Sequence, residues 1–200
     1  MNTLNKKLII AFFSILILGL VGLFTIHEAT QSKANNLPLL YKVPDFQLDN
    51  FDGTLFTEKK LDNKITVASF IFTQCDGACP IMSTNIGILQ KRFSDSDELQ
   101  FISITTDPNY DSKSILQDFS DKYSDKDNWF FLRGDISDVI TLMKDGFKLQ
   151  SDLLPVGHST RLVLIDHNRN IRKYYEGTVD ANILELQYDI VTLINQGEHV

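Results

Sequence analysis

The segment from Val67 to Pro80 constrains the fold of this chain more than any other stretch. It opens with the apolar run Val67–Phe72, whose length and content of Val, Ile and Phe predict a strand buried on both faces. Pro80 suits the first turn of a helix, and apolar residues recur at helical spacing after it. The sequence therefore predicts a buried strand that leads directly into a helix, as in an α/β protein.

The chain contains two cysteines, Cys75 and Cys79, and both lie at this junction. The amino end of a helix carries a partial positive charge, which lowers the pKa of a thiol and favours the thiolate. Thiolates attack disulfides and bind soft metal ions. Because residues four apart share one face of a helical turn, the two side chains could close into a disulfide or hold an ion. A disulfide with a purely structural role would stabilise little, because its loop is so short.

Composition and charge exclude several classes of protein. Hydrophobic residues make up 43% of the 200 residues and charged residues 22%, which are values of a globular protein with one domain and a short appendage. The net charge is −7, and Lys and Arg form no cluster. Nucleic acid is therefore not an expected partner.

The N-terminus predicts a membrane anchor. Two lysines precede the uncharged run 8–26, which as a helix would be about 28 Å long, close to the thickness of a bilayer core. We expect residues 1–7 in the cytoplasm, residues 27–40 as a tether, and the domain 41–200 on the extracytoplasmic (periplasmic) side of a bacterial plasma membrane. That compartment is oxidising, so a disulfide could persist there. A cleaved signal peptide is the alternative to a single-pass anchor.

Within the domain, strand and helix patterns alternate. An Asp-Gly pair in residues 50–53 predicts an N-terminal β-hairpin. Strands are then predicted at 64–72, 99–105, 129–132, 161–165 and 171–175, and helices at 81–93, from 112, at 136–144 and at 181–195, with a loop at 148–157. Parallel strands with helical crossovers come first and an antiparallel pair closes the sheet. We therefore expect an α/β, thioredoxin-like fold with an N-terminal β-hairpin, preceded by one transmembrane helix.

This layout should bring three distant segments to one edge of the sheet. The cysteines follow the carboxyl end of one parallel strand, and Asp107 follows the end of its neighbour. His158 precedes an antiparallel strand that begins at the same edge, where the sites of open α/β sheets lie. Two thiolates and one imidazole form a soft ligand set that suits copper, whereas structural zinc normally takes a fourth protein ligand.

Three motifs, in this order, resemble those of the Sco/SenC family. They are the cysteine motif FTQCDGACP at 72–80, the acidic-proline loop Thr105–Pro108 and the histidine motif His158–Thr160. The resemblance spans roughly residues 41–196. The chain departs from the family pattern before the histidine, where Val156-Gly157 stands in place of an acidic residue.

The resemblance implies a membrane-anchored, thioredoxin-like copper chaperone that helps to assemble the copper centre of cytochrome c oxidase. It implies one copper ion per domain, held by Cys75, Cys79 and His158, with Asp107 as a nearby supporting acid. The implied partner is the copper-receiving subunit of the oxidase or another copper protein, together with a thiol–disulfide reductant. In this interpretation the protein is a chaperone and not an enzyme.

A thiol–disulfide oxidoreductase acting on a client's cysteines is the alternative function. Cys75 would then be the attacking thiolate and Cys79 the resolving thiol. Proteins of that class usually carry two residues between the cysteines and a cis-proline before the facing strand. This chain has three residues between the cysteines and His158–Thr160 at the position of that proline. A thiol peroxidase is a third hypothesis, which ranks last because a second thiol on the same turn is not the usual resolving arrangement.

Overall fold

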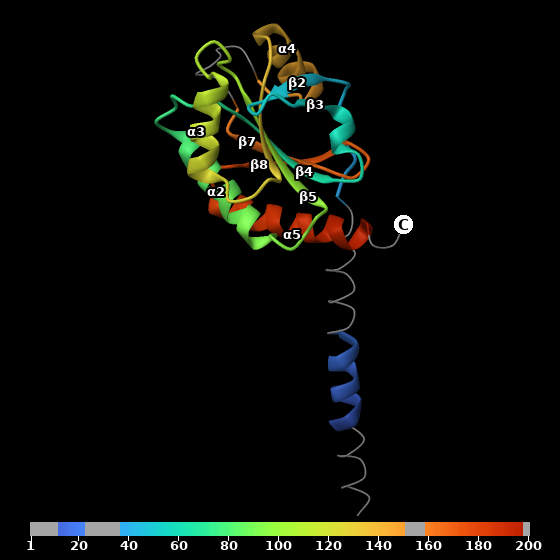
Figure 1. Ribbon diagram of the computed structural model, residues 1–200. Helices are drawn as coiled ribbons and strands as arrows, with labels where there is room; N and C mark the ends of the chain where they lie inside the picture. The colour runs from blue at the N-terminus through green and yellow to red at the C-terminus, as the bar shows by residue number, and fades with distance from the viewer. Residues whose placement is uncertain (1–11, 23–36, 151–158, 198–200) are drawn as a thin grey trace, which may run out of the picture. The chain divides into compact units, whose positions relative to one another are not determined.

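The computed structural model describes residues 12–22, 37–150 and 159–197 of the chain (Figure 1). The chain divides into two compact units, residues 1–37 and residues 38–200. The first unit contains a helix over residues 12–22, and the large apolar side chains of this helix are exposed. Among the described residues, no helix combines the length and the apolar character needed to cross a membrane. The predicted anchor at 8–26 extends past the described helix at both ends.

A single mixed sheet of eight strands forms the centre of the second unit, in the order β1-β8-β7-β4-β5-β6-β2-β3. In chain order the strands are β1 (Tyr41–Lys42), β2 (Gln47–Asn50), β3 (Leu55–Thr57), β4 (Ile65–Ile71), β5 (Leu99–Thr105), β6 (Trp129–Arg133), β7 (Arg161–Ile165) and β8 (Asn170–Glu176). The central pairs β4–β5 and β5–β6 are parallel, and the others are antiparallel. The predicted hairpin is β2–β3, and the predicted parallel strands and closing antiparallel pair, β7–β8, are also present.

Helices cover both faces of this sheet (Figure 1). They are the 3-10 turn η1 (Glu58–Leu61), α2 (Ala78–Arg92), α3 (Lys113–Tyr123), α4 (Ile136–Thr141), the π-helical turn η2 (Leu142–Gly146) and α5 (Asp180–Gly197). The helices α2 and α3 contact each other, and α5 packs on β4 and β8. On the other face, α4 and η2 share one apolar cluster with alternate residues of the central strands, such as Phe70 and Ile104.

The central strands agree with the sequence prediction. Every residue of β4 and of β5 is buried, as expected for strands covered on both faces. Trp129, the first residue of the strand predicted at 129–132, is buried. The helix predicted at 136–144 is correct in position, but it ends as an α-helix at Thr141 and continues as the turn η2. The strand β1 and the turn η1 were not predicted, because two to four residues carry too little periodicity to recognise.

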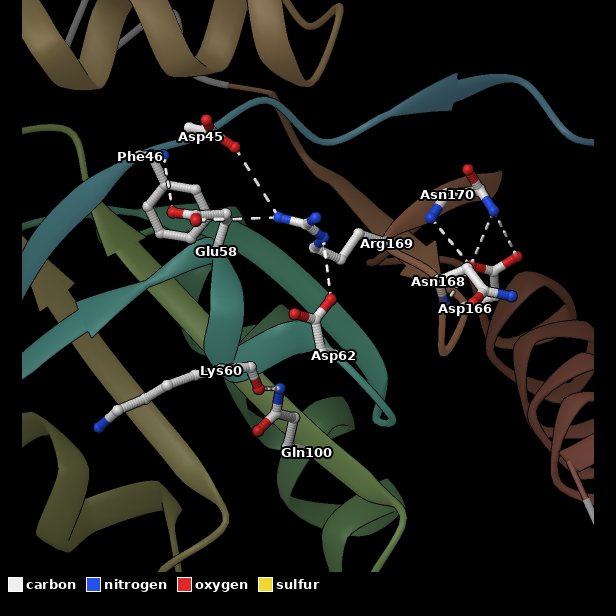
Figure 2. A network of polar contacts seen from close by, with 10 residues as sticks. All are labelled: Asp45, Phe46, Glu58, Lys60, Asp62, Gln100, Asp166, Asn168, Arg169 and Asn170. Carbon is white, nitrogen blue, oxygen red and sulfur yellow. Dashed lines mark hydrogen bonds and ion pairs between the residues drawn. The ribbon is translucent and has the colours of Figure 1, made fainter.

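A charged network joins the β7–β8 turn to the start of the domain (Figure 2). Arg169 has a φ of +65° in this turn, and its carbonyl accepts a hydrogen bond from the Val43 N–H at 2.9 Å. Its guanidinium lies among three carboxylates, at 2.9 Å from Asp62 Oδ1 and 3.8 Å from both Glu58 Oε1 and Asp45 Oδ1. This network fixes the segment before β2 against the closing hairpin of the sheet.

Candidate metal centre

The two cysteines lie where the sequence predicts them, between the end of β4 and the first turn of α2. The chain leaves β4 at Ile71 and turns, with the Cys75 N–H donating to the Phe72 carbonyl at 3.2 Å. The helix begins at Ala78, so Cys79 lies inside its first turn and Cys75 precedes it. No disulfide joins the two cysteines in this structure. One cysteine is therefore carried by a turn and the other by a rigid helix.

The environments of the two thiols differ sharply. Cys75 is partly exposed, and although burial acts to raise its pKa, the N–H groups of Cys79, Gly77 and Ala78 outweigh this and lower the pKa from the ordinary value of 9.0. Cys79 has no exposed surface, and burial raises the pKa of its thiol to about 12. The nearby Cys75 and Asp111 side chains add to that increase. Cys75 is therefore the more readily ionised and the more accessible sulfur.

Asp111 is a functional candidate that the sequence analysis missed. Its carboxylate is fully buried and accepts hydrogen bonds from the Thr73 N–H at 3.2 Å, from the Thr73 hydroxyl at 2.5 Å and from the Thr105 hydroxyl. It thereby joins the end of β5 to the turn before Cys75. The one available signal was a second acid four residues after Asp107 in the loop that follows β5.

Asp107, the predicted supporting acid, lies at the carboxyl end of β5 as expected. Its carbonyl accepts hydrogen bonds from the N–H groups of Tyr110 and Asp111, and its own N–H donates to the Thr105 hydroxyl. Its carboxylate accepts a long hydrogen bond of 3.4 Å from the Tyr110 N–H. These contacts shape the loop that positions Asp111, and a direct role for Asp107 beside a metal stays a prediction.

His158, the predicted third ligand, lies outside the described residues, which resume at Ser159. The strand that follows it runs antiparallel to β4, with Ala68 opposite Val163. Continuing that register places Arg161 opposite Phe70, at the end of β4 from which the cysteine turn departs. Within the described part of the chain, no three His, Cys, Asp or Glu side chains are grouped closely enough to hold a metal ion.

A short chain of hydrogen bonds connects the start of β7 to the cysteine helix. The Gly177 N–H donates to the Thr160 carbonyl at 2.9 Å, and the Asn85 side chain of α2 donates to the Gly177 carbonyl at 2.9 Å. A Cβ atom at position 177 would lie 2.9 Å from both Met82 Cγ and the Thr160 oxygen. Only a glycine allows this close approach, so the residues after His158 are held against the helix that carries Cys79.

Comparison with known proteins shows the family to which the chain belongs. A sequence profile described as SCO1/SenC matches residues 37–194. The chain belongs to the SCO1/SenC family. It is 35% identical over 99 residues to a SCO1 protein homolog of Bacillus subtilis (strain 168), in an alignment that spans 48% of this chain and only about half, 51%, of that relative.

Solved structures of SCO1/SenC proteins share the fold. A crystal structure of a SCO1/SenC family lipoprotein from Bacillus anthracis str. Ames has a TM-score of 0.73 at 33% identity, over 78% of this chain and 97% of that chain. BsSco, described as a member of the Sco family of cytochrome c oxidase assembly proteins with a disulfide switch, has a TM-score of 0.66 at 29% identity, over 76% and 95%. Copper-bound ScoI of Bradyrhizobium japonicum has a TM-score of 0.62 at 20% identity, over 74% and 98%, which shows a common fold. The α/β, thioredoxin-like Sco fold predicted for this chain is therefore confirmed.

Proposed function

We propose that this SCO1/SenC protein binds one copper ion through Cys75, Cys79 and His158 and delivers it to, or prepares, the copper centre of cytochrome c oxidase. The observation that carries this proposal is the pair of unequal thiols at the amino end of α2. Family membership supports it, as does the likeness to a Sco protein described as an oxidase assembly factor and to others whose structures hold copper.

The chemistry of the donors fits copper as a cargo. Thiolates are soft ligands that favour cuprous copper, and an imidazole can complete a three-coordinate set. The Cys75 sulfur, with its lowered pKa, is prepared to bind first. The Cys79 sulfur must release a proton on binding, because its thiol has a pKa of about 12. Affinity should therefore rise with pH. A bond between the two sulfurs would block both ligands, so the cargo can be bound only by the reduced protein.

Metal titration of the reduced full-length chain in detergent tests the ligand set. We expect His158→Ala to weaken the binding of copper, and we expect the matched variant His167→Ala to leave it unchanged. His167 pairs with Glu98 at the amino edge of the sheet, 3.3 Å from its carboxylate and away from the cysteines. Equal affinities of the His158→Ala variant and the parent for both oxidation states of copper would remove His158 from the proposed set.

A second candidate function, thiol–disulfide exchange with a client, is favoured by one specific observation. A partly exposed thiol of lowered pKa beside a buried thiol of raised pKa is the arrangement of an attacking and a resolving cysteine. The Cys75 thiolate would attack a client disulfide and form a mixed disulfide. The Cys79 thiol would then lose its proton and displace the client as a dithiol, leaving this chain oxidised until a thiol reductant restores it. Turnover of a disulfide substrate by the metal-free protein would favour this function over copper delivery.

We also propose that residues 8–26 anchor the domain, residues 38–200, to a bacterial plasma membrane, with residues 1–7 in the cytoplasm and a tether before the domain on the extracytoplasmic side. The exposed apolar side chains of the helix at residues 12–22 support an apolar environment, and the Bacillus anthracis relative is described as a lipoprotein. Alkaline extraction of membranes should leave the full chain in the pellet and release a variant that lacks residues 1–26.

A further inference from the structure

A groove with an apolar floor and an acidic rim lies between the segment that enters β2 and the helical turns α4 and η2. It encloses about 350 Å³ and is lined on one side by residues 44–48 and on the other by residues from 138 to 146. Its apolar lining residues are Pro44, which is exposed, Phe46, which is partly buried, and the buried Leu48 and Leu142. Figure 1 shows β2 and α4 as neighbours.

Three carboxylates lie along the rim of this groove, and its lining contains no basic residue. They belong to Asp45, Asp138 and Asp145, which are all exposed. No described residue forms an ion pair or a side-chain hydrogen bond with Asp138 or Asp145. Asp45 is 3.8 Å from the Arg169 guanidinium with 92% of its side chain exposed, so that ion pair is weak (Figure 2). The rim therefore presents concentrated negative charge beside apolar surface.

The walls of the groove are formed before any ligand arrives. At Gly146 a Cβ atom would lie 3.0 Å from both Pro44 Cγ and Leu142 Cδ1, so the glycine lets the two walls meet at the base. The next residue, Phe147, packs edge-to-face on Phe70 of β4 at 5.3 Å, and its carbonyl accepts the Tyr174 hydroxyl at 3.0 Å. The π-helical form of η2 is itself a feature that is frequent at functional sites.

We propose that this groove is a docking site for a segment of a partner protein in which an aliphatic or aromatic side chain is flanked by Lys or Arg. The apolar side chain would cover the floor, and the basic residues would meet the three carboxylates. The same charges oppose an anionic membrane surface. The proposal does not rest on copper binding, because neither cysteine contributes to the groove.

The position of the groove gives such a partner access to the cysteine edge of the sheet. The helix α4 starts directly after β6, whose carboxyl end lies at the same edge as those of β4 and β5. Arg133, the last residue of β6, donates from Nη2 to the Pro108 carbonyl at 2.9 Å, in the loop that leads to Asp111. A segment held in the groove would thus lie at the same edge of the sheet as the cysteine turn, and neither cysteine lines the groove.

Selection from a randomised peptide library, displayed on phage and applied to the full chain in detergent micelles, tests the proposal. We expect enriched peptides to combine an aliphatic or aromatic residue with neighbouring Lys or Arg. Their affinity, measured by fluorescence anisotropy, should fall about tenfold in an Asp138→Asn, Asp145→Asn double variant, since each lost surface charge pair is a modest contribution. The matched double variant Asp118→Asn, Asp127→Asn removes two exposed acids outside the groove and should bind as the parent does.

A second variant separates shape from charge. Thr141→Trp fills the groove at an exposed position and leaves all three carboxylates in place, so it should also weaken binding. Enrichment of acidic or purely polar peptides, or equal losses in the groove and control double variants, would overturn the proposal. Copper affinity should be the same in all these variants, which keeps this test independent of the proposed function.

Discussion

The Asp111 carboxylate accepts a hydrogen bond from the Thr73 hydroxyl at 2.5 Å and so joins the loop after β5 to the turn that presents Cys75. The pKa of the Cys79 thiol is raised mainly by burial, and the Asp111 carboxylate raises it further. The buried Asp111 carboxylate thus affects both cysteines. It holds the turn that carries Cys75, and its negative charge raises the pKa of Cys79. This relationship makes position 111 the most informative target near the proposed site.

Asp111→Asn should lower the pKa of Cys79 and reduce the stability of the domain. The pKa falls because the negative charge is removed. The free energy of unfolding falls by about 1–3 kcal/mol because three donors, two of Thr73 and one of the buried Thr105, lose a charged acceptor. Thiolate absorbance against pH in a Cys75→Ser background reports the first effect, and urea denaturation the second. Asp118→Asn, on the exposed face of α3, is the control. An unchanged Cys79 pKa in Asp111→Asn would show that the Asp111 charge does not act on this thiol.

Alkylation should distinguish the two cysteines. Cys75 is partly exposed with a lowered pKa, whereas Cys79 is buried with a pKa of about 12, so iodoacetamide at mildly alkaline pH should label Cys75 first. Mass spectrometry of peptides from the reduced, metal-free protein gives the order directly. Labelling of Cys79 at an equal rate would contradict the burial found here.

Stability should fall at alkaline pH because of Cys79. Below pH 9.0 the thiol is protonated in both the folded and the unfolded chain, so its contribution is fully present. Between pH 9.0 and about 12 the unfolded chain loses a proton that the folded chain keeps, and stability drops by about 1.4 kcal/mol per pH unit. The measurement is the urea midpoint of the reduced protein across this range, compared with Cys79→Ser. The difference in urea midpoint between the two proteins should shrink as the pH rises. A constant difference would exclude a contribution of Cys79 ionisation to stability.

Replacing two buried serines by alanine should affect the stability of the domain differently. Ser103 Oγ accepts the Trp129 indole N–H at 2.9 Å and lies 2.8 Å from Ser69 Oγ, whereas Ser83 Oγ is buried with no hydrogen-bond partner among the described residues. Ser103→Ala should therefore lower the free energy of unfolding by about 1–3 kcal/mol and alter the emission of the one tryptophan. Ser83→Ala should be neutral or slightly stabilising. Thermal denaturation followed by fluorescence compares the two, and equal losses would contradict the network.

Arg169→Met should destabilise the domain through the carboxylates it leaves behind. Glu58 is buried, and removing the guanidinium leaves its charge uncompensated, at a cost of about 2 kcal/mol or more. Methionine keeps a β-carbon, so the unfavourable positive φ is the same in both proteins. The double variant Arg169→Met, Glu58→Gln should recover part of the loss in urea denaturation. If the double variant were no more stable than Arg169→Met, the loss of stability would come from packing and not from the uncompensated charge.

Local patterns were sufficient for the central part of this fold. The run Val67–Phe72 predicts a buried strand because apolar content and length are properties of the segment itself, and β4 lies at 65–71. Cys75 and Cys79 could be placed at the amino end of a helix because the turn, Pro80 and the helical spacing are contiguous in sequence. The alternation of strands and helices then predicted crossover connections, which join parallel strands of one sheet.

Tertiary structure decided what depends on groups that are distant in the chain. Thr73 and Asp111 are 38 residues apart, and no periodicity shows that a carboxylate from one loop will be buried beneath the other. The unequal pKa values of the two thiols have the same origin, since burial and neighbouring charges are properties of the packed molecule. The sequence by itself determined which strand leads into the cysteines. Packing determined that the Cys79 thiol is buried with a raised pKa and the Cys75 thiol partly exposed with a lowered one.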